Sequence, residues 1–348
     1  MLGSVLVACG DDAATGASGG GGKVKITLPS DVTLVLWAVD YLSEDLGFYE
    51  EEGLTIERVP FGGGPLAMQG LLSGAGTANL QTPGEFLGAV AKNQELKALM
   101  SHTNVIGATL VVSERFAKRI GVTAEDSAEA KTAALGSVKG ARYAITAPGS
   151  QTDALTRMAV RQFGLDPDSE ARIVPLQTAA NNLPALQNDR IDGFIAQSPV
   201  PEQAIVDLKA VPLLSVTDGD IRGAERLAGQ TLVARASDIE SEPELFERLV
   251  RANVRGLQVL VETPDKARDR LRKSRFADVD DRIWPLMWRN NLPTWRSPYV
   301  ASDSLGAWVE NGLVEGESDP AALSLDETIE PRFVEEAVKA VGWEPPAV

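Results

Sequence analysis

The side chains best placed for ligand chemistry lie in Pro148-Gly149-Ser150-Gln151-Thr152-Asp153, which follows a predicted strand and opens a predicted helix. Ser150 can cap the first turn of that helix, and Asp153, three positions later, completes a box-like arrangement. Gly149 lets a ligand approach bare backbone N–H groups, and a helix N-terminus favours an anion or a carbonyl oxygen. An ordinary capped turn has the same composition, so the assignment depends on what gathers beside it.

Other polar residues also follow predicted strands, at the carboxyl ends where ligands gather in an open parallel sheet. Asp31 is either a turn residue or a partner for a ligand amine, and Trp37 either stacks on a ligand or packs in the core. His102, in a predicted crossing segment at 101–107, is a wall or hinge residue. The candidate ligand-binding residues are Ser30, Asp31, Trp37, Gln81, Thr82, His102, Ser150, Gln151, Thr152, Gln177 and Gln197.

Several kinds of chemistry lack the residues they need. Cys9 is the only cysteine and His102 the only histidine, so internal disulfides, Cys/His zinc sites and Ser-His-Asp hydrolysis are excluded or nearly so. The glycines at 62–64 have neither the Lys and Ser/Thr of a P-loop nor GxGxxG spacing. The net charge of −16 repels phosphate backbones, which argues against nucleic acid. We therefore expect no metal and no cofactor.

The elements that must position these residues repeat a β-α-β-α-β order. Alternating Val24, Ile26 and Leu28 predict a strand, and helix 36–49, strand 54–59, a Pro65-started helix and strand 77–80 follow. Strands at 96–100 and 108–113 flank the crossing segment. This order is typical of a mostly parallel sheet covered by helices.

A second copy of the order runs from strand 141–147 through a helix ended by Gly164, strand 173–176, a Pro184 helix and strand 191–196. Residues 232–234 predict a strand that returns to the first lobe. From 242 to 343 the chain is predicted to be helical and to pack on the first lobe. It carries five of the six tryptophans, mostly as core, although one of Trp284, Trp288 and Trp295 is a candidate for the cleft rim.

Cys9 ends a short apolar run and precedes a Gly-, Ala-, Ser-, Thr- and Asp-rich stretch at 10–22. This arrangement resembles a bacterial lipoprotein signal, in which the cysteine carries the lipid and the following residues form a tether with a reach of about 20 Å. The apolar stretch is short and has no preceding Lys or Arg, so 1–22 is interpreted as a signal remnant plus tether whose start lies upstream. No apolar run approaches the roughly 18–20 residues that span a bilayer.

Four stretches together resemble the solute-binding proteins of ABC importers for nitrate, sulfonates, taurine and thiamine-precursor pyrimidines. They are DLGFYEEEGL at 45–54, QGLLSG at 69–74, GSQT at 149–152 and IDGF at 191–194 followed by Pro199. The resemblance implies a two-lobed α/β periplasmic-binding fold (type II) with a helical C-terminal tail. Lobe 1 would comprise 23–107 and 229–345, and lobe 2 would comprise 108–228.

The resemblance also implies the function: a monomer, extracytoplasmic and lipid-anchored through Cys9, that binds a small solute between its lobes and delivers it to a membrane permease. The positions that carry over are Gln81, Thr82, Ser150, Gln151 and Thr152, with Ser30, Asp31, Trp37 and Gln197. Neutral amides and hydroxyls with one candidate acid favour an uncharged or weakly anionic solute.

Two alternative interpretations of the function stay open. A thiamine-pyrimidine synthase-like enzyme shares this architecture but uses a histidine and a lysine-bound pyridoxal phosphate. His102 is the only candidate histidine, and no lysine stands beside it at a predicted strand end. The other reading is an extracellular sensor domain that hands its ligand to a receptor.

Overall fold

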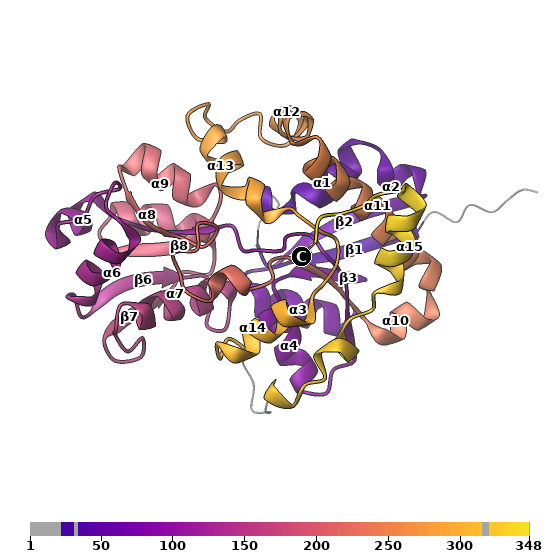
Figure 1. Ribbon diagram of the computed structural model, residues 1–348, viewed down its shortest axis with the longest axis horizontal. Coiled ribbons are helices and arrows are strands. Elements are labelled where there is room, and N and C mark those ends of the chain that lie inside the picture. Colours follow the sequence, from indigo (N-terminus) through magenta and orange to yellow (C-terminus); the bar gives the residue numbers. More distant parts are fainter. Residues whose placement is uncertain (1–21, 31–33, 315–319, 348) are drawn as a thin grey trace, which may run out of the picture.

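The computed structural model describes residues 22–30, 34–314 and 320–347. They form two lobes, each built on a five-stranded sheet flanked by helices (Figure 1). The predicted two-lobed α/β architecture is therefore confirmed. Residues 102–107 and 216–230 cross between the two sheets.

The sheet of lobe 1 has the order β2-β1-β3-β10-β4. Strand β10 runs antiparallel to both of its neighbours, and the other four strands share one direction. Val24, Ile26, Leu28 and also Thr27 are buried, because helices cover both faces of this sheet. The strands are β1 (Gly22–Leu28), β2 (Leu54–Pro60), β3 (Ala78–Gln81), β4 (Leu96–Ser101) and β10 (Thr231–Arg235).

The sheet of lobe 2 repeats this topology with the order β7-β6-β8-β5-β9. Here β5 is the one antiparallel strand. In each lobe the antiparallel strand is thus the first strand after the chain crosses from the other lobe. The strands are β5 (Ala108–Val112), β6 (Ala141–Ile145), β7 (Ala171–Pro175), β8 (Gly193–Gln197) and β9 (Val211–Ser215).

The helices of lobe 1 differ from prediction in two places. The segment 36–49 is not one helix: it breaks at Gly47, whose left-handed backbone (φ 79°) ends one helix and starts the next. A helix that was not predicted, α4, follows β3 directly. The elements are a 3₁₀ turn η1 (Val35–Trp37), α1 (Ala38–Asp45), α2 (Phe48–Glu51), α3 (Gly64–Leu72) and α4 (Pro83–Ala91).

The helices of lobe 2 cover both faces of its sheet (Figure 1). The predicted helix after β6 is confirmed as α7, and the predicted Pro184 helix as α8. The helices are α5 (Glu114–Ile120), α6 (Ala128–Gly136), α7 (Gln151–Gln162), α8 (Asn182–Gln187) and α9 (Val200–Leu208), with short 3₁₀ turns η2 (Ala179–Asn181) and η3 (Ala224–Arg226).

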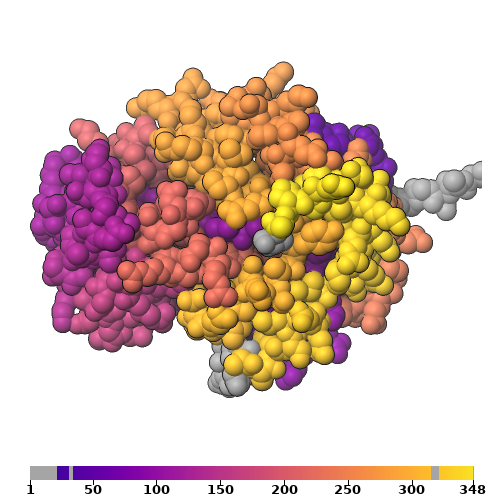
Figure 2. All heavy atoms as spheres, in the orientation of Figure 1, coloured from indigo at the N-terminus to yellow at the C-terminus, as the bar shows by residue number. Residues whose placement is uncertain are grey.

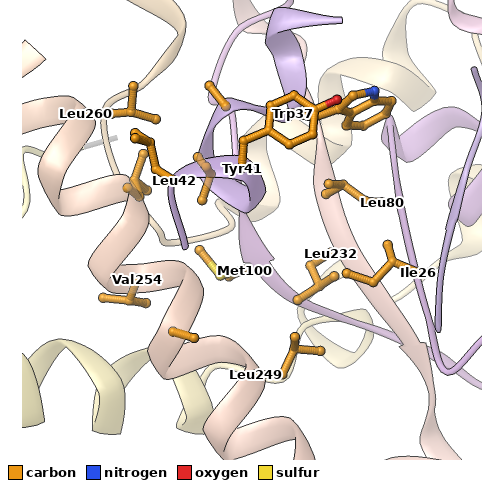
Figure 3. Packing of buried hydrophobic residues seen from close by; sticks show 14 of the residues in the cluster. Ile26, Trp37, Tyr41, Leu42, Leu80, Met100, Leu232, Leu249, Val254 and Leu260 are labelled. Carbon is orange, nitrogen blue, oxygen red and sulfur yellow. The ribbon is translucent and has the colours of Figure 1, made fainter. Parts of the chain in front are cut away.

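The C-terminal segment is helical and packs mainly on lobe 1, as predicted. Its longest helix, α11, lies against α1 and α15, and its apolar face joins the core of the sheet. Figure 3 shows side chains of this cluster from α1, the sheet and α11 pointing toward one another. The helices are α10 (Ala236–Ser241), α11 (Pro243–Glu262), α12 (Pro264–Ser274), α13 (Trp284–Asn291), α14 (Ser302–Glu310) and α15 (Arg332–Val341), with 3₁₀ turns η4 (Leu292–Thr294), η5 (Pro320–Ala322) and η6 (Leu325–Thr328).

The tail tryptophans form part of the core. Phe276, Trp284, Trp288 and Trp295 make a continuous row, with successive ring centroids 5.2, 5.8 and 5.1 Å apart. All four side chains are buried. The first pair of rings is stacked and the other two pairs are tilted, and such ring contacts stabilise the core in addition to the burial of apolar area. The expectation that one of these tryptophans reaches the cleft rim is not met.

The tail also contacts lobe 2. Asn291 Nδ2 donates to Ser198 Oγ at 2.8 Å, and Asn290 Nδ2 donates to Glu202 Oε1 at 2.8 Å. Ser198 Oγ in turn donates to the same Glu202 oxygen at 2.7 Å. Figure 2 shows the orange and yellow C-terminal segments over lobe 1 and extending to the edge of lobe 2. These bonds join α13 to α9 across the two lobes.

Candidate ligand-binding cleft

A small cavity lies between the lobes, at the carboxyl ends of strands from both sheets. Its volume is about 50 Å³. At about 10–15 Å³ for each water, this space holds only a few waters or a small solute. The lining residues are Pro29, Ser30, Leu34, Leu36, Trp37, Gly64, Thr82, Glu85, Thr146, Ser150, Gln151, Thr152, Ala179, Ala196, Gln197 and Gln230.

A second cavity of about 210 Å³ adjoins the first. The two share Pro29, Ser30, Leu34, Thr146 and Ala179. The second adds Gln177, Thr178 and several apolar residues of lobe 2, together with Phe61 of lobe 1. The cleft therefore continues from a narrow space, the inner cavity, into a wider one, the outer cavity.

The lobe 2 wall is the turn that opens α7. Ser150 Oγ accepts the backbone N–H of Asp153, and a carboxylate oxygen of Asp153 accepts the N–H of Gly149 at 3.0 Å. Gly149 has φ 73°, in the left-handed region that favours glycine. The predicted cap and box-like arrangement are confirmed. They leave the start of a 12-residue helix at the cavity.

Three hydroxyls form a closed triangle on this wall. Thr146, Ser150 and Thr152 have mutual oxygen distances of 3.0 Å. Thr152 Oγ1 also accepts the backbone N–H of Thr146 at 2.9 Å, which fixes the triangle to the end of β6. Because hydroxyl hydrogens rotate, each O–H can turn from its neighbour to a ligand acceptor without moving the oxygen.

Two amides complete the lobe 2 wall. Gln197 Nε2 donates to Gln151 Oε1 at 2.7 Å, which orients the Gln151 amide. Gln151 is only 9% exposed, and its Nε2 has no hydrogen-bond partner among the described residues. A buried amide nitrogen without a partner is costly, so this group is suited to donate to a ligand or an ordered water.

The lobe 1 wall combines apolar side chains with one carboxylate. Trp37, fully buried, and Leu34 give apolar surface, and Thr82 Oγ1 donates to Glu85 Oε2 at 3.2 Å. A Cβ at Gly64 would lie 1.8 Å from Glu85 Oε1, so glycine leaves room for the carboxylate in this position. Gln230 adds an Oε1 that is buried and has no partner in the described part of the chain.

The structure thus brings together most of the predicted residues. Ser30, Trp37, Thr82, Ser150, Gln151, Thr152 and Gln197 line the inner cavity, and Gln177 lines the outer one. Asp31 lies outside the described residues. Cys9 and the tether at 10–22 also lie outside them, apart from Gly22, which begins β1.

Two predicted residues are placed elsewhere. Gln81 and His102 are each 1% exposed and are not among the described residues that line the two cavities. Neither side chain has a hydrogen-bond partner in the described chain. Burial lowers the pKa of His102 to about 3, so the ring is neutral at physiological pH. His102 belongs to the buried crossing region.

Three polar lining residues of the inner cavity were not predicted: Thr146, Glu85 and Gln230. Glu85 was missed because α4 was missed, although Thr82-Pro83-Gly84-Glu85 has a helix-start pattern with Pro at the first position. Thr146 is the last polar residue before the predicted turn. Gln230 lies in a crossing segment, whose position depends on how the lobes pair, and no local pattern marks it.

Other kinds of site find no support in the described part of the chain. No group of three or more His, Cys, Asp or Glu there is arranged to hold a metal ion. None of its helices has the length and apolar character required to cross a membrane.

Two lobes with this strand order, linked by two crossings around a polar cavity, define a periplasmic-binding-protein fold. The solved structures that resemble it agree. They include a ligand-binding component of an ABC-type import system from Staphylococcus aureus, solved with zinc bound (14% identity, TM-score 0.69, 91% of this chain and 99% of that one). The nitrate-binding protein NrtA from Synechocystis PCC 6803 has 16% identity and a TM-score of 0.69, covering 92% and 89%.

The aliphatic sulphonate-binding protein SsuA from Escherichia coli has 17% identity and a TM-score of 0.62, with 94% and 93% covered. At these identities the likeness establishes the fold. The model of the NMT1-like family matches residues 41–272, and the chain belongs to that family. A search of curated proteins finds no significant match.

Proposed function

We propose that this protein is the extracytoplasmic solute-binding component of an ABC importer. It binds a small polar solute between its lobes and presents it to a membrane permease. The observation that carries the proposal is the inner cavity, which both lobes line and into which Gln151 brings a buried, unpartnered amide nitrogen. The NMT1-like family and structural neighbours named for nitrate, sulphonate and ABC import support it.

Ligand contacts to both lobes give the mechanism. A solute between α7 of lobe 2 and the Thr82–Glu85 wall of lobe 1 interacts with both walls only when the lobes are together. It therefore shifts a hinge equilibrium toward the closed form, by as much as its affinity differs between the two forms. The crossing segments at 102–107 and 216–230 are the hinge candidates.

The protein is proposed to bind its solute without converting it. His102 is buried and lines neither cavity, and burial holds its pKa far below the usual range. A lysine for a pyridoxal Schiff base is missing from the described lining of both cavities. These observations favour a binding protein over the synthase-like enzyme.

A thermal-shift panel tests the proposal with nitrate, ethanesulfonate, taurine, 4-aminopyrimidine and riboflavin. A bound solute adds RT ln(1 + [L]/Kd) to the free energy of unfolding, about 2.7 kcal/mol at a hundredfold excess over Kd. We expect at least one compound to raise the melting temperature and to be recovered unchanged. Product formation or a pyridoxal absorbance band would favour the enzyme instead.

Variants locate the binding site. Gln151→Ala and Thr152→Ala should each weaken binding of the compound that shifts the melt. Gln187→Ala is the matched control, because Gln187 is exposed on α8 of the same lobe and lines neither cavity. Equal affinity in all three variants would mean that the solute binds elsewhere.

The lipid anchor at Cys9 stays a separate prediction. In cells that process lipoproteins, the protein should be found in the membrane fraction, and Cys9→Ser should release it. A variant that stays with the membrane would contradict the anchor without affecting the solute site.

A further inference from the structure

The charge of the cavity wall is unsuited to binding an oxyanion. Glu85 is a lining residue of the inner cavity, and none of the described residues that line either cavity is Lys, Arg or His. An anion placed there would meet a carboxylate and no positive side chain. At short range and low dielectric, such like-charge contact costs several kcal/mol.

Glu85 is held in place by the structure around it. It is in the first turn of the nine-residue helix α4, where the helix dipole favours a negative charge. The Thr82 hydroxyl donates to one carboxylate oxygen, and the missing Cβ of Gly64 leaves room for the other. Three local features therefore position a carboxylate at the inner cavity.

The charged and the unpartnered groups of the two walls differ in hydrogen-bonding character. On the lobe 1 side, Glu85 and the unpartnered Oε1 of Gln230 can only accept. On the lobe 2 side, the unpartnered Nε2 of Gln151 can only donate, and the hydroxyl triangle and the start of α7 can donate as well. The cavity is small enough for one solute to contact both walls.

We propose that the solute is bipolar, with an ammonium or amino N–H group that Glu85 binds and a hydrogen-bond acceptor that Gln151 binds. This inference rests on the proposed function and specifies the solute class of the same cavity. It differs from the expectation of an uncharged or weakly anionic solute, which was formed without Glu85. Trp37, which also lines the inner cavity, is an aromatic residue of the kind that attracts cations.

The test uses two compound pairs that differ only in an amino group, with nitrate as a plain oxyanion. The pairs are taurine with ethanesulfonate and 4-aminopyrimidine with pyrimidine. Binding is measured by calorimetry on the full chain and on Glu85→Gln, which keeps the shape of the side chain and removes its charge. Glu95→Gln is the matched control, because Glu95 is exposed just after α4 and lines neither cavity.

We expect an amino compound to bind more tightly than its partner without the amino group. Glu85→Gln should weaken that binding about tenfold or more, since a charged hydrogen bond is lost, and Glu95→Gln should leave it unchanged. The melting temperature of each unliganded variant reports whether it folds.

Two outcomes would overturn the inference alone, and a third would count against the function on which it rests. Tighter binding of nitrate or ethanesulfonate than of any amino compound would do so and would leave the proposed function intact. Unchanged affinity of Glu85→Gln for the bound amino compound would also do so. Failure of all five compounds to bind would count against the proposed function itself, for solutes of the sulfonate, nitrate and pyrimidine classes.

Discussion

The pH dependence that His102, the single histidine, gives to the free energy of unfolding tests how the crossing region is packed. His102 is 1% exposed, and neither ring nitrogen has a partner among the described residues. Its backbone N–H donates to the carbonyl of Gln230 at 2.7 Å, which ties one crossing segment to the other. Burial lowers the pKa of His102 from 6.5 to about 3. Protonating the ring therefore favours the unfolded chain.

The sign and size of the change in unfolding free energy with pH follow from the two pKa values of His102. A base whose pKa is lowered on folding contributes stability that is present above its unfolded pKa and is lost as the pH falls toward its folded pKa. With pKa values of 6.5 and about 3, the loss is about 2 kcal/mol between pH 8 and pH 5 and about 3 kcal/mol by pH 4.

The assay is urea unfolding of the wild type and His102→Gln at pH 8, 6.5, 5 and 4. The variant has its own cost at every pH, so the quantity of interest is how the difference changes with pH. We expect the variant to gain about 2 kcal/mol relative to the wild type between pH 8 and pH 5. A difference that stays constant, or a native imidazole that titrates near pH 6.5 by NMR, would refute the reasoning.

Three further predictions concern stability. Arg58→Met leaves the carboxylate of Asp40 buried without its ion pair and should cost about 3–5 kcal/mol in urea unfolding; a loss under 1 kcal/mol would contradict this. Burial raises the pKa of Glu202, so its contribution is present below pH 4.5 and lost at higher pH. Calorimetric melts should then shift in favour of Glu202→Gln as the pH rises, and a constant difference would count against it. Ser150→Ala removes the cap that Asp153 N–H uses and should cost about 1 kcal/mol in chemical unfolding, where no change would argue against the cap.

The sequence was informative where one local pattern decides the structure. Alternating apolar residues marked β1, Pro65 marked the start of α3, and Gly149-Ser150 marked the capped start of α7. The break at Gly47 was missed because apolar spacing continues through it, and the left-handed backbone there leaves no mark in periodicity. Strands β5 and β10 run opposite to their neighbours, and each is the first strand after a crossing between the lobes. No local sequence pattern predicts that direction.

The same distinction holds for the site. Strand ends predicted Ser150, Gln151 and Thr152 because the capped turn is local. Gln81 follows the same rule and yet is buried and lines neither cavity, since a strand-end residue can face either the cleft or the sheet interior. The position of Glu85 depends on a helix that begins immediately after β3. Its effect on the charge of the cavity depends on the lack of Lys, Arg and His in the described cavity lining, and only the assembled fold reveals that lining.

The central claim is that one solute contacts both lobes at the inner cavity. Hydrogen–deuterium exchange measures this most directly, with and without a saturating amount of the panel compound that gives the largest thermal shift. We expect slower exchange at both 82–87 and 146–153, with little change on the outer face of α11. Protection confined to one lobe, or located away from both segments, would contradict it.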